Sequence, residues 1–422
     1  MINGIREIRT IYCVCLLTII VSTNLLSNSV SSNVMQAGVI RVIGTFTYRD
    51  YANVPRSLVW ARVYICDREQ DGQDYILRER FTDMNGYFDS GLIVNDDGPG
   101  ENGLDIVIYV FAWNWAVQII NSSGTKYYVQ GGPWNDCPDG ALLNVTANFI
   151  HGAWMIFSYH NGITAGWNYL NSSVSYDMPM ATAVWPYNTS NPFYDAENEM
   201  IFLPDWAVHP DITLHEYAHY VMNITYGYMP PASGQYSING TSDTNTAWVE
   251  GWAFFFPLVV QNDPSFLDLN LETPHWCSPN WDDGDQVVGR VAGALWDIFD
   301  SQEDGYDTYH DGFTHIWNIM ETTPCDTLHD FWQAWNTSGY PKQSALMSIF
   351  QNSIDYRGTG DVNADGIVDI YDLTAVTAIF GAQKGDPNWD QLADLDRIIC
   401  PDLIDIYDVV IVALNYGKYY DP

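Results

Sequence analysis

The pattern of apolar and polar positions divides the chain into three regions. Between residues 38 and 135, short runs rich in Val, Ile, Tyr and Phe alternate with turn residues such as Asn85-Gly86. These runs predict strands at Val39–Tyr48, Val59–Cys66, Tyr75–Thr82 and Ile106–Trp113. Several short strands separated by such turns predict an all-β sandwich. The stretch from Gly131 to Gly140 is interpreted as a linker or an elaborated loop.

Residues 141–355 have a helical period instead. Helices are predicted at Ile212–Tyr226, Thr246–Gln261, Asp285–Phe299, Gly312–Thr322 and Leu328–Asn336, after a short strand at Glu199–Pro204. This mixture predicts an α+β domain. Residues 358–420 contain a repeat, because Ile367–Gly381 and Leu403–Gly417 align without gaps at an offset of 36 residues. The fold class is therefore multidomain: a β-sandwich, an α+β domain and a small α module of paired repeats.

The N-terminus has the pattern of an export signal. Arg6 and Arg9 precede an apolar run from Ile11 to Val21, and small polar residues follow to Asn33. We expect a signal peptide at residues 1–33, a secreted protein and no membrane segment after removal of the signal. The alternative is an uncleaved anchor, since the run extended to Leu26 approaches spanning length.

The charge balance restricts the class of partner. The chain has 16 Lys+Arg against 52 Asp+Glu, a net charge of −36. This excludes a nucleic-acid partner, which needs clustered basic residues. It fits cation binding or a generic acidic extracellular surface.

Two further features bear on an exported protein. Seven N-x-[ST] sequons permit glycosylation, at Asn121, Asn144, Asn171, Asn188, Asn223, Asn239 and Asn336. Five cysteines remain after the signal, and a disulfide between Cys277 and Cys325 is plausible in an oxidising compartment.

A metal-binding spacing occurs in the second region, in Asp211-Ile-Thr-Leu-His-Glu-Tyr-Ala-His219. On a helix, His215 and His219 project from one face, so both imidazoles can reach one zinc ion. Glu216 can then take a proton from a zinc-activated water. The motif is expected by chance only about 0.005 times in a chain of this composition.

A third zinc ligand must lie elsewhere. A metzincin would have glycine and histidine at the positions of Met222 and Thr225, so the sequence does not fit the metzincin pattern. Four glutamates follow His219, and Glu250 alone stands in an apolar helical stretch, Thr246–Phe256. An unpaired charge there is costly unless it is bound to a metal or a partner.

The motif HExxH followed by Trp248-Val-Glu-Gly-Trp-Ala253 resembles the gluzincin metallopeptidases, which include thermolysin-like proteases and aminopeptidases. The resemblance implies that His215, His219 and Glu250 hold zinc. It also implies that Glu216 is the general base for hydrolysis of a protein or peptide substrate. No GxMEN-type aminopeptidase signature precedes the motif, which favours an endopeptidase. The gap from His219 to Glu250 is longer than in either group and leaves the exact family open.

Gluzincins also place a His or Tyr near the developing oxyanion, where a donor stabilises charge. The candidates are Tyr306, Tyr309, His310 and His315, of which His315 is our choice. Asp297 is an isolated carboxylate in an apolar helix. It either orients a ligand histidine or makes a structural hydrogen bond.

The repeats have calcium-ligand spacing. In Gly360–Asp372, the side chains at EF-hand positions 1, 3, 5, 9 and 12 are those of Asp361, Asn363, Asp365, Asp369 and Asp372. Ile367 offers its backbone carbonyl at position 7. The final Asp in place of Glu, the missing preceding helix and the duplication resemble a type I dockerin. A dockerin implies a cohesin-bearing scaffold as partner; the alternative is a calcium-stabilised module without a partner. In the second copy, Asp394, Asp396, Asp405 and Asp408 remain, but three extra residues intervene and the glycine is missing.

The segment Thr82–Phe88 resembles the TDxxGxF turn of carboxypeptidase-regulatory-like, transthyretin-type sandwiches, which implies an accessory role. The sequence as a whole predicts a secreted zinc peptidase with a calcium-binding module. Two alternatives stay open: a binding or scaffold protein with an inactive zincin domain, and a zinc hydrolase of a non-peptide bond. Intact Glu216 argues against the first.

Overall fold

The computed structural model describes residues 20–22, 38–97, 102–149, 153–206, 208–232, 235–273, 275–302, 304–310, 312–396 and 403–420. The chain forms two compact units, one of residues 1–168 and 177–213 and one of residues 169–176 and 214–422. Apart from Ile20–Ser22, the expected signal peptide lies outside the described residues. No helix in the described ranges is both long and apolar enough to cross a bilayer.

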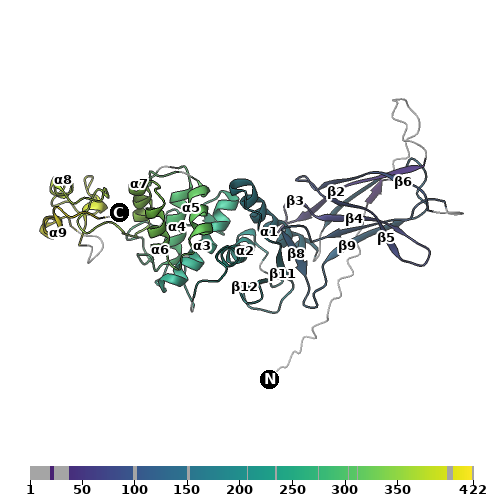
Figure 1. The fold of residues 1–422 in the computed structure, drawn as a ribbon, viewed down its shortest axis with the longest axis horizontal. Coiled ribbons are helices and arrows are strands. Elements are labelled where there is room, and N and C mark those ends of the chain that lie inside the picture. The colour runs from purple at the N-terminus through teal and green to yellow at the C-terminus, as the bar shows by residue number, and fades with distance from the viewer. Residues whose placement is uncertain are drawn as a thin grey trace, which may run out of the picture. The chain divides into compact units, whose positions relative to one another are not determined.

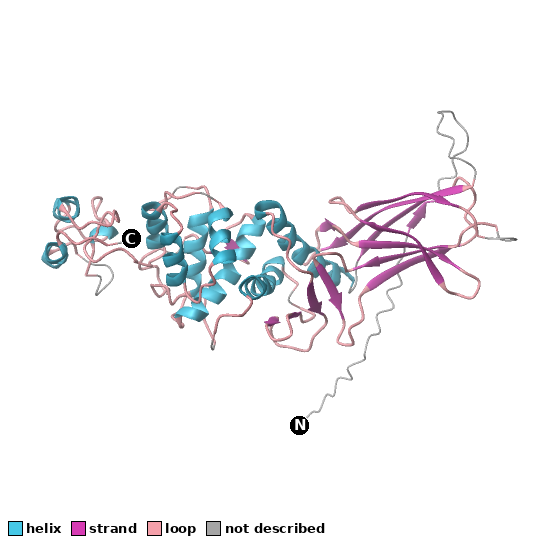
Figure 2. Ribbon diagram, viewed as in Figure 1, coloured by secondary structure: helices cyan, strands magenta, loops and turns pink. Residues whose placement is uncertain are grey.

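The first unit consists mainly of β-sheet (Figures 1 and 2). In one sheet the order is β1–β10–β2–β3, with β6 also paired to β2. Its strands are β1 (Ile20–Ser22), β2 (Val39–Arg49), β3 (Pro55–Ser57), β6 (Tyr87–Val94) and β10 (Leu142–Phe149). β10 runs parallel to β2, whereas β3 and β6 pair with β2 antiparallel.

A second sheet has the order β5–β4–β7–β9 and is antiparallel throughout. Its strands are β4 (Arg62–Arg68), β5 (Asp74–Phe81), β7 (Ile106–Phe111) and β9 (Tyr128–Trp134). Val63 and Val110 are buried while their neighbours Arg62 and Phe111 are half-buried, the alternation that one buried sheet face requires.

The prediction of a linker over residues 131–140 is wrong at its beginning. β9 continues to Trp134 and pairs with β7. The run Gly-Gly-Pro is tolerated there because β9 is an edge strand, where a proline need not donate to a neighbour. β10 then extends the β-sheet region to Phe149.

A third sheet has the order β12–β13–β11–β8. Its strands are β8 (Val117–Ile120), β11 (Ala181–Val184), β12 (Phe193–Asp195) and β13 (Met200–Phe202). α1 (Ala153–Val174) separates β10 from β11 in the chain. The sequence pattern did not predict α1, because this helix has no acidic residue in its first turn, no basic residue in its last turn and an internal Asn-Gly pair.

The second unit is helical. It contains α2 (Pro210–Tyr226), which begins in the first unit, and α3 (Thr244–Gln261), α4 (Val288–Phe299), α5 (Phe313–Thr322), α6 (Leu328–Thr337) and α7 (Lys342–Gln351). The hairpin β14 (Ser265–Phe266) and β15 (Leu269–Asn270) follows α3. All five predicted helices are confirmed, and α7 is additional. Fully buried tryptophans fill the helical core: Trp248, Trp252, Trp317, Trp332 and Trp335.

The repeats form α8 (Ile370–Ala378), the 3-10 turn η1 (Gln391–Ala393) and α9 (Ile406–Asn415) around a small apolar core. The two copies exchange equivalent backbone bonds. Gly381 N–H donates to the Ile404 carbonyl (2.7 Å), and Gly417 N–H donates to the Val368 carbonyl (2.8 Å). Each copy thus closes against the helix end of the other, so the repeats form one structural unit.

Two expectations about modification need correction. Cys277 is disulfide-bonded, but Cys325 is free and buried, so the predicted Cys277–Cys325 pair is wrong. The sequon at Asn223 lies on α2 with the asparagine 7% exposed, so it cannot accept a glycan in the folded chain.

Candidate metal centre

The two motif histidines lie on α2, whose ends the sequence defines. Pro210 occupies the first turn, where its missing N–H is harmless, and Asp211 adds a carboxylate there. The helix stops before Gly227, which has φ 74° and donates its N–H to the Asn223 carbonyl (2.8 Å). His215 and His219 are one turn apart, and their ring centroids lie 4.8 Å from each other.

α3 brings the third residue of the centre, Glu250. The Asp243 side chain caps α3 by accepting from Thr246 N–H at 2.9 Å. The Trp252 indole N–H donates to the Ala218 carbonyl at 3.1 Å, which fixes α3 against α2 beside the histidines. A Cβ on Gly251 would lie 2.5 Å from Val291 Cγ1, so glycine is needed for the close approach of α4.

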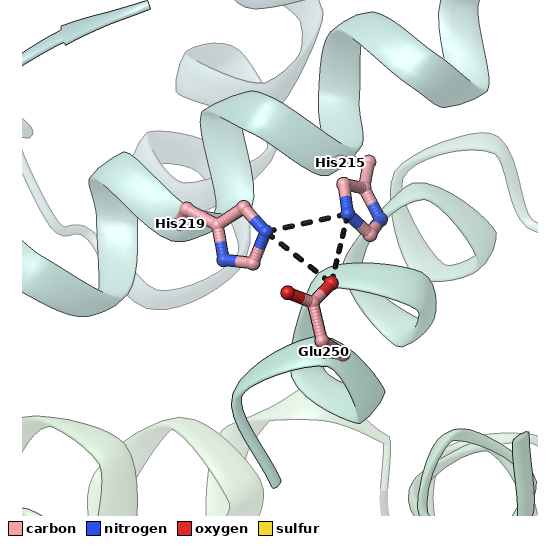
Figure 3. A group of neighbouring side chains, drawn as sticks. All are labelled: His215, His219 and Glu250. Carbon is pink, nitrogen blue, oxygen red and sulfur yellow. Dashed lines mark hydrogen bonds and ion pairs between the residues drawn. The ribbon is translucent and has the colours of Figure 1, made fainter. Parts of the chain in front are cut away.

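Figure 3 shows that His215, His219 and Glu250 point toward one another. The two Nε2 atoms are 3.3 Å apart. Glu250 Oε2 lies 3.2 Å from His215 Nε2 and 3.6 Å from His219 Nε2. These short distances lack hydrogen-bond geometry at the carboxylate, because Glu250 Oε2 is buried without a hydrogen-bond partner. Three lone-pair atoms therefore converge on one point.

The spacing fits a tetrahedral zinc ion. Ligand atoms about 2.0–2.1 Å from a tetrahedral centre are roughly 3.3–3.4 Å from each other, and the three observed distances bracket this value. Two imidazoles and one carboxylate are also a donor set that zinc prefers. His215 and His219 are only 8% and 7% exposed, so the two ligand side chains are largely buried.

The charges in the centre favour a cation. Burial acts to lower the pKa of His219, but the negative charges of the adjacent Glu250 and of Glu216 outweigh burial and raise it. Burial acts to raise the pKa of Glu250, and the two histidines outweigh it and lower that pKa. Glu216 is itself buried and near enough for its charge to act on His219.

Tyr236 is a site residue that the sequence did not reveal. It lies in the loop between α2 and α3, close enough to Glu250 for the two groups to influence each other. Burial of its hydroxyl raises the pKa of Tyr236, and the charges of Glu250 and Glu216 raise it further. The residue as a whole is 36% exposed. No spacing or periodicity marks a loop tyrosine of this kind.

Packing, rather than a second hydrogen bond, orients the histidines. The His215 ring contacts Phe254 (4.8 Å between centroids) and Phe266 (5.9 Å). The Nδ1 atoms of both histidines are buried without a hydrogen-bond partner. The idea that Asp297 orients one of them is therefore wrong. Asp297 instead accepts from Asn352 Nδ2 at 2.7 Å, and burial raises its pKa well above the usual range.

The four donor candidates from the sequence make contacts of their own in the described part of the chain. His315 pairs with the Tyr309 hydroxyl (2.8 Å) and stacks on Tyr340 (3.8 Å between centroids). The Tyr306 hydroxyl donates to Asp390 at 2.6 Å. His310 lines a cavity of about 430 Å³ together with residues that include Asp300 and Glu272. The choice of His315 stays a prediction, and Tyr236 is a further candidate because it lies beside Glu250.

The first repeated loop folds around its own carboxylates. Asp361 accepts from the N–H groups of Asp365 (3.2 Å) and Gly366 (2.9 Å). Asp372 accepts from Val362 and Asn363 at the start of the loop and from Asp369 near its end. Burial and the charges of Asp372 and Asp365 raise the pKa of Asp361 to about 6. Ligand positions 1 and 12 are thus brought together.

The second loop repeats this arrangement despite its insertion. Asp408 accepts from Leu395 and Asp396 N–H at the start of the loop and from Asp405 near its end. Carboxylate oxygens of Asp394, Asp396 and Asp408 all lie within 4.8 Å of one another. The added residues fall between Asp396 and Asp405, so they do not disturb this group.

The chain has one informative similarity to known proteins. A family model described as "Mycolysin C-terminal domain" matches residues 161–353, a stretch that includes His215, Glu216, His219 and Glu250. The match supports an association with secreted metallopeptidases, and because the model describes a C-terminal domain it does not by itself assign a reaction. Among solved structures, a 9R-lipoxygenase from Cyanothece PCC8801 is 13% identical with a TM-score of 0.20, over 63% of this chain and 29% of that one. Similarity this low carries no argument about fold or function. No curated protein matches the chain.

Proposed function

We propose that the chain is a secreted zinc peptidase in which His215, His219 and Glu250 hold the metal. The observation that carries this proposal is the near-equilateral triangle of two Nε2 atoms and one carboxylate oxygen, with sides of 3.2, 3.3 and 3.6 Å. The family match over residues 161–353 supports a peptidase context.

Zinc at this position would supply a Lewis acid that makes an attacking water more acidic. Glu216 follows His215 on the same helix, and its carboxylate would accept a proton from the attacking water and return it to the leaving amine. Its buried position beside His219 keeps bulk water from competing for this proton.

Tyr236 is proposed as the donor to the oxyanion that develops on the scissile carbonyl. Its hydroxyl lies near Glu250, which would be a metal ligand, and we therefore assign it to the rim of the reaction centre. Its raised pKa keeps the hydroxyl protonated and able to donate. Because Tyr236 is in a loop, substrate can reach it from solvent.

The C-terminal module is proposed to bind calcium in both loops as a dockerin-like unit. The matching bonds made by Asp372 and Asp408 support this. The helices also expose the same pair of residues in each copy, Ile370-Tyr371 and Ile406-Tyr407. Exposed aliphatic and aromatic residues of this kind suit a protein partner, for which a cohesin-bearing scaffold is the candidate. The N-terminal β-sheet region would be an accessory sandwich.

The test compares cleavage of an unfolded protein by wild type and Glu216→Gln, with zinc content measured in both. We expect the variant to keep about one zinc per chain and to lose at least about 10²-fold in kcat, the usual contribution of a general base. Activity unchanged in a zinc-loaded variant would exclude this role for Glu216.

The same two proteins, wild type and Glu216→Gln, also distinguish two other candidate functions from a peptidase. A binding protein with an inactive site would hold zinc but cleave no better than Glu216→Gln. A hydrolase of another bond would fail with protein substrates but release product from small esters or amides, and would do so only with Glu216 intact.

A further inference from the structure

Arg357 is a buried cation at the point where the chain enters the C-terminal module. Its side chain is 1% exposed and forms an ion pair with Asp355, in which Nε and Nη2 donate to the two carboxylate oxygens at 2.9 and 3.1 Å. A buried guanidinium is costly unless its donors are used. Neither residue is assigned above to zinc or calcium, so their burial needs another explanation.

The Nη1 group of Arg357 bonds to the entrances of both calcium loops. It donates to the Val362 carbonyl at 2.8 Å and to the Leu392 carbonyl at 3.1 Å. Val362 lies between the first two calcium positions of the first loop, and Leu392 lies two residues before Asp394, the first calcium position of the second loop. One nitrogen therefore holds the beginnings of two loops that are separate in the sequence.

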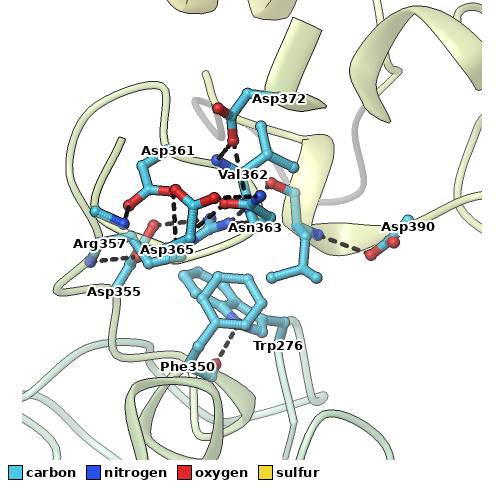
Figure 4. Close-up of polar contacts among 12 residues, drawn as sticks. Trp276, Phe350, Asp355, Arg357, Asp361, Val362, Asn363, Asp365, Asp372 and Asp390 are labelled. Atoms are coloured by element: carbon cyan, nitrogen blue, oxygen red, sulfur yellow. Dashed lines mark hydrogen bonds and ion pairs between the residues drawn. The ribbon is translucent and has the colours of Figure 1, made fainter. Parts of the chain in front are cut away.

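The same guanidinium contacts the helical part of the second unit, which comprises α2 to α7. It lies 4.3 Å from the ring centroid of Phe350, a fully buried residue near the end of α7 (Figure 4). The Trp276 indole N–H donates to the Phe350 carbonyl at 2.6 Å, which fixes this end of α7. A cation over an aromatic face is held most strongly where water is excluded. Arg357 thus contacts both calcium loops and α7.

Two further sets of hydrogen bonds join the C-terminal module to the helical part. Gln343 on α7 donates from Nε2 to the Asn363 carbonyl in the first loop at 2.8 Å. The Tyr306 hydroxyl donates to Asp390 at 2.6 Å and accepts from Gln391 N–H at 3.2 Å, at the 3-10 turn that precedes the second loop. Contiguous packed and hydrogen-bonded contacts of this kind can carry energetic coupling between two sites.

We propose that Arg357 is a positioning residue that couples the two calcium loops to each other and to the helical part. The proposal rests on the proposed binding of calcium by both loops. Asp361 and Asn363 flank Val362, so a calcium ion that orders them also fixes the carbonyl that Arg357 binds. Arg357 in turn holds Leu392 ahead of the second loop and packs on α7. Calcium in one loop therefore favours calcium in the other, and both stabilise the helical part.

The test measures calcium binding to the full zinc-loaded chain by calorimetry. Asp372→Asn disables the first loop and Asp408→Asn disables the second, so each variant gives the affinity of the remaining loop. In the wild type, the two-site association constant should exceed the product of the two single-loop constants by about five- to tenfold, the lower end of the usual range for coupled sites. In the Arg357→Lys background this coupling factor should fall below about twofold, because an ammonium cannot bind Asp355 and both carbonyls as the planar guanidinium does.

Arg290→Lys is the matched control for the loss of a buried guanidinium. Arg290 is fully buried, lies 5.3 Å from the Trp281 ring centroid and donates to the Asp283 carboxylate and to the carbonyls of Asp282 and His275. These partners all lie outside the C-terminal module. The control should therefore destabilise the fold as Arg357→Lys does, but should keep the wild-type coupling factor.

Coupling to the helical part is measured by thermal unfolding. Near-UV circular dichroism reports this part, because its core holds the fully buried tryptophans. Calcium should raise the melting temperature of wild type and Arg290→Lys, and should raise that of Arg357→Lys less than half as much. Asp355→Asn loosens Arg357 without removing its charge, and it should reduce the coupling factor even if Arg357→Lys does not fold.

The number of calcium ions bound separates the two ways in which the proposal can fail. A wild type that binds no calcium overturns the assignment of calcium to the loops and this proposal with it. A wild type that binds two ions with a constant equal to the product of the single-loop constants overturns the coupling alone. A wild-type coupling factor in both Arg357→Lys and Asp355→Asn, or an equal loss in Arg290→Lys, overturns the role of Arg357.

Discussion

Replacing Trp252 by phenylalanine should weaken the metal centre more than it weakens the fold. Trp252 is fully buried, and its indole N–H bonds to the Ala218 carbonyl, one residue before His219. Phenylalanine keeps an aromatic ring but removes this bond between α2 and α3. The lost hydrogen bond is worth about 1 kcal/mol. The smaller ring adds about 1–2 kcal/mol of cavity cost.

Trp317→Phe is the matched control for ring size. Trp317 is 1% exposed and its indole nitrogen makes no hydrogen bond, so this variant pays only for the smaller ring. The free energy of unfolding of the zinc-free chain should therefore fall by about 1 kcal/mol more for Trp252→Phe than for Trp317→Phe.

The effect of Trp252→Phe on zinc binding is measured separately from its effect on the zinc-free fold. Looser contact between α2 and α3 should spread His219 and Glu250 and lower zinc affinity about tenfold, which reduces the stabilisation by zinc by about 1.4 kcal/mol. Urea unfolding with and without zinc, with competitive zinc titration, measures both quantities. Equal losses in the two variants and unchanged zinc affinity in Trp252→Phe would refute the reasoning that this bond positions the centre.

Three further predictions test the remaining assignments. Tyr236→Phe should lower kcat by about 10–10³-fold with zinc content unchanged, whereas His315→Phe should leave kcat near wild type. If steady-state assays give the reverse order, His315 and not Tyr236 is the donor to the oxyanion. Burial and neighbouring carboxylates raise the pKa of Asp300 to about 7, so the folded chain binds this proton more tightly than the unfolded chain. The resulting stability is complete below about pH 4 and is lost as pH rises through 7. At pH 8, the free energy of unfolding from urea titration should thus be about 1–2 kcal/mol higher for Asp300→Asn than for wild type, after allowance for solvent screening. Near pH 4 the two proteins should be equally stable. Asp372→Asn and Asp408→Asn should each reduce the calcium-induced rise in melting temperature of the chain; a normal rise in Asp408→Asn would mean that the second loop does not bind calcium.

The sequence predicted the centre where local spacing determines it. His215 and His219 share a face because any helix puts residues four apart there, and Glu250 was recognised because a charge in an apolar helix requires a partner. Tyr236 was missed because a loop residue reaches Glu250 only through the fold of residues 227–243. His315 and Asp297 have plausible sequence contexts, but their bonds to Tyr309 and Asn352 depend on how distant helices pack.

The same limit applies to the fold. Strand and helix periods predicted β2, β4, β5, β7 and β13 and the helices α2 to α6, but they missed the other strands, α1 and α7. The parallel pairing of β8 with β11 joins residues about 60 positions apart and leaves no local pattern. The Cys277–Cys325 pairing failed for a related reason, since cysteine spacing does not determine which thiols meet.

The path of the chain through the repeated module affects how this protein can be engineered. The Tyr420 hydroxyl donates to the Thr359 carbonyl at 3.1 Å, and a Cβ on Gly358 would lie 2.1 Å from the Tyr420 ring. The chain therefore leaves the module beside the point where it enters. An affinity tag or fluorescent protein attached after Tyr420 would emerge there and leave the paired Ile-Tyr residues of α8 and α9 accessible. A circular permutation that joins these adjacent ends with a short linker should also preserve the module.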